Sequence, residues 1–328
     1  MEKNKKNVIK LSGIMLIYIL LSALGLFGQI GTILFPIIAL PFTLFCMQNK
    51  VAKELHILFH VVVSIAIYLM VNSVLGILIY IVSVIIPTYI ILFLYKQELA
   101  LPNIIMYGGL ILAAIVFVYF SIMKGLGFDF EAQFGVGLDR ITTEFSATLD
   151  NMVSMGVPSG MNMAELQTSM NQMKEMVSVS IEMLKTLYAA IIVSQTAICF
   201  SITVIITNAI ARRRMPNLPH TREILNFRVS KVAVLLLVLS MLLTDMNTSV
   251  STEVLVFAYN LMSFLASLFE IVGMLSLIEL LRRTSIHSGI KLLGYVGIVI
   301  LFMTSPYLLM FFGCLDALFN YRKVSIVV

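Results

Sequence analysis

The chain has little charge and few cysteines. Only 12% of its 328 residues are charged, roughly half the share found in soluble domains. Cys46, Cys199 and Cys314 all lie inside apolar runs and show no CxxC spacing, so neither disulfides nor a thiolate metal site is expected. The net charge of +5 comes from basic residues at the ends of apolar runs, which gives no reason to expect nucleic acid as a partner.

Motifs for nucleotide binding and for catalysis are also missing. The sequence holds no GxxxxGK[ST], HExxH or GxSxG, so it cannot power transport from a nucleotide site of its own and offers no catalytic residues. His56 and His60 share a helical face, a spacing that suits a metal. Their place at a membrane border favours an interfacial role. We therefore expect no enzyme, no cofactor and no metal.

Apolar residues dominate instead. They make up 60% of the chain and form runs near membrane-spanning length, which predicts a multi-pass membrane protein. Backbone groups in lipid must bond within their own segment, so the fold class is all-α: a polytopic transmembrane helix bundle of eight to ten spans. We place the spans at about 9–27, 29–47, 55–73, 75–95, 104–123, 184–210, 230–247, 252–281, 288–304 and 305–321.

Three regions follow from these runs. Residues 1–123 hold about five spans, residues 124–183 form the only long stretch that is not membrane-like, and residues 184–328 hold four or five more. The count in the last region depends on Pro306, which either separates two spans or bends one long helix. The first apolar stretch lacks a cleavage site, so it is expected to remain as a helix.

Lysine and arginine predict the orientation. Most of them fall on one side of the predicted membrane, which is expected to be cytoplasmic. That side holds Lys3, Lys5, Lys6, Lys10, Lys50, Lys53, Lys96, Arg212, Arg213, Arg214, Arg222, Arg228, Lys231, Arg282, Arg283 and Lys291, joined by Arg322 and Lys323 if the last two spans form a hairpin. The protein is thus expected in the bacterial plasma membrane with a cytoplasmic N-terminus.

The segment 124–183 predicts an extracytoplasmic amphipathic helical hairpin. Two apolar seams step by three and four residues: Phe134, Leu138, Ile141, Phe145, Leu149 and Met152, then Leu166, Met170, Met173, Val177, Ile181 and Leu184. Gly156, Pro158 and Gly160 break the helix between them, and we expect Phe145 and Met173 to share the core of the hairpin. Met170, Met173 and Met176 have a spacing that can hold Cu(I), but methionine is also an adaptable core residue.

Glu270 lies within the apolar run 254–281, where a carboxyl group must be neutral, paired or facing a polar cavity. Asn260, Ser263, Ser267 and Glu270 follow spacings of three, four and three, which places them on one helical face. This face is the predicted substrate-binding site for a small solute. The alternative is that these side chains join helices, with Glu270 paired to one neighbour.

Two motifs carry a family resemblance. They are the proline-containing basic loop LPHTREILNFRVS, with Phe227 and Arg228, and the terminal GCLDALFNYRK, with Gly313, Asp316 and Arg322. Together with the many spans, they resemble the YybS-like family of uncharacterised bacterial membrane proteins. That resemblance implies no established activity. As an analogy of fold, the chain also looks distantly similar to the substrate-binding membrane components of energy-coupling-factor vitamin transporters.

Two functions follow from this reading. The first is a small-solute binding or transport component with its site around Glu270, which depends on a separate energising protein or on an ion gradient. The second is a non-transporting scaffold or regulator that acts through the outer hairpin and the basic loop. In both, membrane lipids are partners, and the basic loop attracts anionic headgroups.

Overall fold

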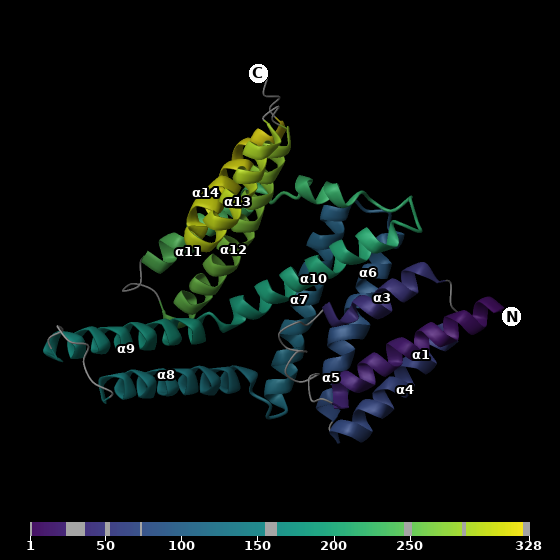
Figure 1. The fold of residues 1–328 in the computed structure, drawn as a ribbon, viewed down its shortest axis with the longest axis horizontal. Helices are drawn as coiled ribbons and strands as arrows, with labels where there is room; N and C mark the ends of the chain where they lie inside the picture. The colour runs from purple at the N-terminus through teal and green to yellow at the C-terminus, as the bar shows by residue number, and fades with distance from the viewer. Residues whose placement is uncertain are drawn as a thin grey trace. The chain divides into compact units, whose positions relative to one another are not determined.

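The computed structural model describes residues 2–23, 37–49, 53–72, 74–154, 163–245, 251–283 and 287–323 (Figure 1). Every regular element within these ranges is helical. They are α1 (Glu2–Ala23), η1 (Ile37–Ala39), α3 (Leu40–Gln48), α4 (Lys53–Val71), α5 (Val74–Tyr80), η2 (Ile81–Ile85), α6 (Ile86–Lys96), α7 (Leu101–Gly125), α8 (Phe130–Ser154), α9 (Met163–Thr186), α10 (Tyr188–Ala211), η3 (Thr221–Asn226), α11 (Lys231–Asp245), α12 (Thr252–Arg283), α13 (Ser288–Thr304), α14 (Pro306–Phe319) and η4 (Tyr321–Lys323). The all-α prediction is confirmed.

In the part of the chain that the structure describes, five helical segments are long and apolar enough to cross a membrane. They are Glu54–Val71, Val74–Lys96, Leu101–Gly125, Tyr188–Ala211 and Thr252–Arg283. The pair α13 and α14 meets the same criteria together but bends by 112° at its break, which answers the question of one helix or two at Pro306.

The described residues hold fewer helices of span length than the eight to ten spans predicted. Two shorter apolar helices, Asn7–Leu21 and Ile37–Gln48, have 10–17 residues each within the described ranges, fewer than the roughly 20 that a span needs, and α11 reaches the edge of the described residues at Asp245. Residues 24–36 and 246–250, where three predicted spans begin or end, lie outside the described residues.

The chain divides into two compact units, and helices α7, α10 and α12 run through both. The first unit comprises residues 1–116, 193–231 and 267–328, and the second comprises residues 117–192 and 232–266. Each is described separately below.

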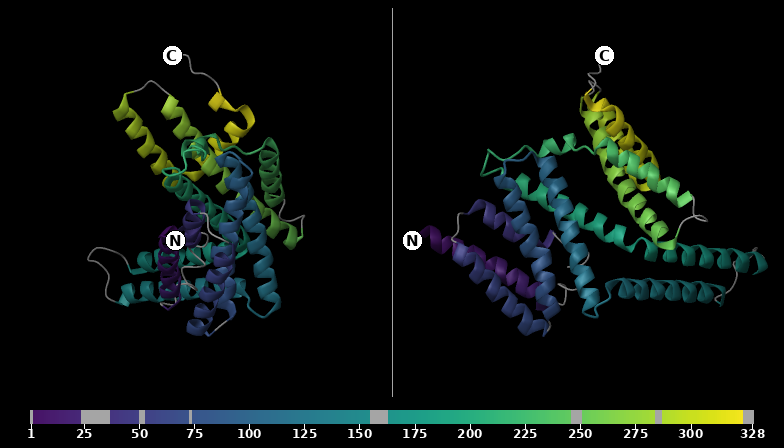
Figure 2. Two further views of the ribbon diagram at one scale, coloured as in Figure 1. Left: turned by 90° about the vertical axis from the view of Figure 1, so that its right-hand side faces the viewer. Right: turned by 180° about the vertical axis from the view of Figure 1, so that it is seen from behind.

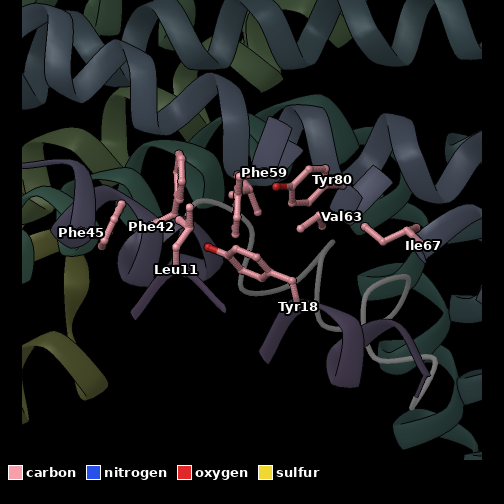
Figure 3. Packing of buried hydrophobic residues seen from close by; sticks show 9 residues of the cluster. Leu11, Tyr18, Phe42, Phe45, Phe59, Val63, Ile67 and Tyr80 are labelled. Atoms are coloured by element: carbon pink, nitrogen blue, oxygen red, sulfur yellow. The ribbon is translucent and has the colours of Figure 1, made fainter. Parts of the chain in front are cut away.

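An aromatic core holds the N-terminal helices of the first unit together (Figure 3). Tyr18, Phe42 and Tyr80 are fully buried there, and the rings of Phe42 and Phe59 stack with centroids 4.8 Å apart. The Tyr18 hydroxyl donates to the Ile38 carbonyl at 3.0 Å, so its burial leaves the polar atom satisfied. These contacts fix α1, α3 and α4 around the π-helical segment η2.

The π-helix η2 explains how a proline sits inside a span. Pro87 is the second residue after it, in the first turn of α6, and proline cannot donate the hydrogen bond that a straight helix requires at that point. A π-helical turn absorbs this mismatch without breaking the segment. Nearby, the hydroxyls of Thr43 and Thr88 lie 2.8 Å apart in a fully buried contact between α3 and α6.

In the second unit, α8 and α9 lie side by side (Figure 2). Lys174 pairs with Asp150 at 2.6 Å and Lys185 pairs with Asp139 at 2.7 Å, which fixes the two arms in an antiparallel register. The predicted helical hairpin is confirmed. Leu149, Met170 and Ile181 are its buried seam residues.

One detail of that hairpin is wrong. Met173 is 43% exposed, whereas Met170, one turn earlier, is buried. Phe145 is half-buried. The core of the hairpin therefore lies beside Met170 rather than Met173, because a stepping pattern identifies a broad face and not its centre line.

Candidate functional site

Helix α12 carries all four residues of the predicted polar face. It has 32 residues, which corresponds to a length of about 48 Å. No proline interrupts it, so the spacing of three, four and three keeps these side chains on one stripe. The structure nevertheless gives the members of the stripe different environments.

Asn260 acts as a connector between helices. Its amide nitrogen donates to the carbonyls of Thr186 and Val256, both at 2.8 Å, and its amide oxygen accepts from the Ala190 backbone N–H at 2.9 Å. These bonds bridge the junction of α9 and α10, where backbone groups lack helical partners. The Asn260 side chain is therefore hydrogen-bonded to backbone groups, as expected if the residues of this face join helices.

Glu270 differs from Asn260. Ser263 and Ser267 each have an interaction partner, but no described residue forms an ion pair or hydrogen bond with the Glu270 carboxyl, which is half-buried. A membrane-spanning helix rarely carries an ionisable group unless that group faces a partner or a polar path. Of these four residues, Glu270 is the one for which the described residues supply no such partner.

Helices α12 and α14 touch backbone to backbone less than one turn beyond Glu270. A Cβ built on Gly273 would overlap the Leu309 carbonyl oxygen and lie 2.9 Å from the Gly313 nitrogen. A Cβ on Gly313 would overlap the Phe269 carbonyl oxygen. Only glycine permits this approach, which is how small residues bring membrane helices together. The crossing holds Glu270 at a fixed distance from α14.

An ionic cluster lies at the C-terminal end of α12. Glu279, whose side chain is 2% exposed, accepts from Arg282 at 2.7 Å and from Arg283 at 2.6 Å. Arg322, with 1% of its side chain exposed, pairs with the fully buried carboxylate of Asp316. Charges this deeply buried are tolerated only when they are paired and hydrogen-bonded.

Backbone carbonyls complete the cluster. Arg322 donates to the carbonyls of Leu225 and Phe227, the latter at 2.8 Å, and Arg283 donates to the carbonyl of Arg322. The end of α12, the residues after α14 and the loop that follows α10 therefore meet at one end of the first unit.

Tyr321 adds uncharged hydrogen bonds at the same end of the first unit. Its hydroxyl lies 2.5 Å from the Ser276 hydroxyl on α12 and donates to the Phe312 carbonyl at 3.3 Å. Burial raises the pKa of the Tyr321 phenol above its usual value, so the group stays protonated and able to donate.

The histidines have protein partners that the sequence did not reveal. His60 Nδ1 lies 2.8 Å from the Tyr80 hydroxyl, and His56 Nε2 lies 3.8 Å from Cys46 Sγ. Within the described ranges, no three His, Cys, Asp or Glu side chains gather in a way that could hold a metal ion. These pairs connect α4 to neighbouring helices.

A cleft of about 600 Å³ opens elsewhere in the first unit. It is lined by Lys10, Gly13, Ile14, Ile17, Pro41, Leu44, Phe45, Gln48, Asn49, Ile210, Arg213 and Arg214. None of the four polar-face residues of α12 lines it. Lys10 and the two arginines were all predicted on the cytoplasmic side, and the structure places them around one cleft.

Comparison with known proteins gives one match. The family model described as "Predicted membrane protein (DUF2232)" matches residues 14–317, which is nearly the whole chain. The chain belongs to the DUF2232 family. No curated protein and no solved structure matches it.

In this DUF2232 chain, the two motifs that suggested a family lie together. Phe227, from the basic loop, accepts a hydrogen bond from Arg322, and Asp316 pairs with Arg322. Gly313, from the same terminal motif, forms the crossing with α12. The motifs were recognisable in sequence, but their joint role in one buried cluster was not, because 95 residues separate Phe227 from Arg322.

Proposed function

We propose that the protein is a small-solute binding or transport component in which Glu270 binds a proton or a cation. One observation carries the proposal: Glu270 lies in a membrane-spanning helix without an ion-pair or hydrogen-bond partner among the described residues. A charged group at the centre of a bilayer costs about 2.5–3.5 kcal/mol on insertion scales. A structural helix would avoid that cost with glutamine, so the acid is best explained by its ability to bind and release a cation.

The chain lacks a nucleotide motif, so the proposed transport depends on an ion gradient or on a separate energising protein. The resemblance to YybS-like proteins, and through them to the membrane components of energy-coupling-factor transporters, supports a partner of the second kind. Asn260 is removed from the proposed site because its amide is used by backbone groups. Ser267 remains in it, in the same unit and on the same stripe as Glu270.

The test uses dicyclohexylcarbodiimide, an apolar reagent that modifies protonated carboxyls within membranes. We expect it to label Glu270, with a rate that falls as pH rises from 5 to 8 and falls again when Na⁺ or K⁺ competes. Glu270→Gln should abolish this labelling and leave the melting temperature in detergent close to that of wild type, since glutamine has nearly the same size and the carboxyl has no ion-pair or hydrogen-bond partner among the described residues.

Glu253→Gln is the matched control, because Glu253 is an exposed carboxylate in the first turn of the same helix. This variant should keep the Glu270 labelling unchanged. A Glu270 label that depends on neither pH nor cations would end the proposal, as would a large loss of stability in Glu270→Gln, which would point to helix joining instead.

A second candidate, the scaffold, is favoured by the surface of α9. Met176, Val179 and Met183 are exposed and lie roughly opposite the buried Met170 and Ile181 on the helical wheel. An amphipathic hairpin needs only one apolar face for its own core. A second apolar stripe is a feature of helices that dock a partner.

A further inference from the structure

We propose that the cleft at the basic end of the first unit binds one anionic phospholipid, with its phosphate held by Lys10, Arg213 and Arg214. Its acyl chain would lie against an apolar wall formed by Ile14, Ile17, Leu44 and Ile210. The inference is independent of the proposed function, since no residue of the Glu270 face takes part.

The charges of the cleft favour an anion. Three of its lining residues are cationic and none is acidic. Arg214 is held in place because its guanidinium donates to the Gln48 side chain at 2.8 Å. A fixed guanidinium presents donors in the geometry that a phosphate accepts. Lys10 and Arg213 are exposed, so both are able to reach the same ligand.

The apolar wall distinguishes a lipid from a free anion. Ile17 is 46% exposed and Ile210 is 38% exposed, and both lie on apolar helices beside the cations. A cleft of about 600 Å³ falls inside the roughly 300–1,000 Å³ usual for small-molecule sites. Basic pockets between membrane helices bind anionic headgroups in this way. An amphiphile with an anionic head satisfies both halves of the cleft.

Native mass spectrometry of the full chain in detergent, titrated with defined lipids, tests the proposal. We expect one dioleoyl phosphatidylglycerol to bind at least tenfold more tightly than dioleoyl phosphatidylcholine, which matches it in chain length but has no net charge. The double variant Lys10→Gln/Arg213→Gln should weaken phosphatidylglycerol about thirtyfold, the factor expected for two basic residues at a membrane surface.

The charge control is Arg222→Gln/Lys231→Gln. It removes the same net charge from two exposed residues, and neither residue lines the cleft. Binding in this control should stay within about threefold of wild type, because screening limits the reach of exposed charges. An equal loss in both double variants would show that general surface charge, and not the cleft, attracts the lipid.

Gly13 permits a second variant that keeps every charge. It lines the cleft, and a Cβ built on it meets nothing within 4 Å, so Gly13→Leu should fill the cleft without a clash and favour the helix. We expect it to abolish the one tightly bound lipid. Gly297→Leu is the control, since Gly297 also has open space on a membrane helix but lies outside the cleft.

Three outcomes would overturn the proposal. The first is equal affinity for phosphatidylglycerol and phosphatidylcholine. The second is unchanged binding in Gly13→Leu. The third is full competition by inorganic phosphate at a concentration equal to that of the lipid, which would assign the cleft to a free anion.

Discussion

Among the residues that the structure describes, Arg322 is the largest fully buried side chain. It pairs with Asp316 and donates to two carbonyls from the loop after α10. A buried ion pair contributes little net stability compared with a well-packed apolar pair, but the loss of one partner leaves an uncompensated charge. The main contribution of the Asp316–Arg322 pair is therefore to join the segment after α14 to the loop after α10.

Arg322→Met should destabilise the protein by about 3–5 kcal/mol, because Asp316 then remains buried without its cation. Asp316→Leu alone should be similarly harmful. The double variant Asp316→Leu/Arg322→Met should recover much of the loss. Melting temperatures in detergent give the three values, and strictly additive losses in the double variant would show that the two groups do not depend on each other.

Asn260 shows where residue-level reasoning from sequence stops. Periodicity placed it correctly on the stripe with Glu270, and its type allowed either a ligand or another helix as partner. Its bonds go to Thr186 and Ala190, 74 and 70 residues away. Nothing in the local sequence identifies such partners, because they depend on where α9 ends and how α10 packs against α12.

Among the elements, the hairpin α8–α9 was the most predictable. Its seams, its Gly/Pro break and its length are local properties, and all of them were readable from the sequence. The centre of its core was not, because a seam of six residues covers a broad face.

The hairpin predicts a contrast between two residues of α8. Leu149 is buried, whereas Ile141, two turns earlier on the same seam, is 56% exposed. Leu149→Asp should open the hairpin, since it loses at least ~2 kcal/mol of packing and also buries a charge. Ile141→Asp should have little effect.

Limited proteolysis of the protein in detergent measures this contrast. Leu149→Asp should be cut within 130–186 at least tenfold faster than wild type, in line with that loss of free energy. Equal cleavage rates for Leu149→Asp and Ile141→Asp would contradict the observed packing of the two arms.

At the scale of the whole molecule, the ionic cluster at the C-terminal end of α12 constrains how the chain crosses the membrane. The end of α12, the residues after α14 and the loop 221–227 contact one another, so they lie on the same side of the membrane. If α12 crosses, the chain must also cross between this loop and Thr252, where α11 is the helix that the structure describes. The pair α13–α14 must enter and return on one side.

Cysteine labelling of intact cells tests this topology. In a background where Cys46, Cys199 and Cys314 are replaced by alanine, single cysteines at Gln172 and Ser251 should react with an impermeant maleimide. Cysteines at Asn217, Ser230 and Ser288 should be protected until the membrane is opened. Reaction at Ser288 or protection at Ser251 would contradict the inferred crossings, and equal reaction at Gln172 and Asn217 would contradict the predicted orientation.

The glycine contact between α12 and α14 has a mechanical consequence. Most packed helices can slide or turn by small changes of side-chain rotamer, because side chains act as a compliant layer between the two backbones. At Gly273 and Gly313 no side chain separates the two backbones. Helices α12 and α14 are therefore expected to move together. Any movement that accompanies a change of charge at Glu270 must therefore carry α14, and with it Asp316, as a single body.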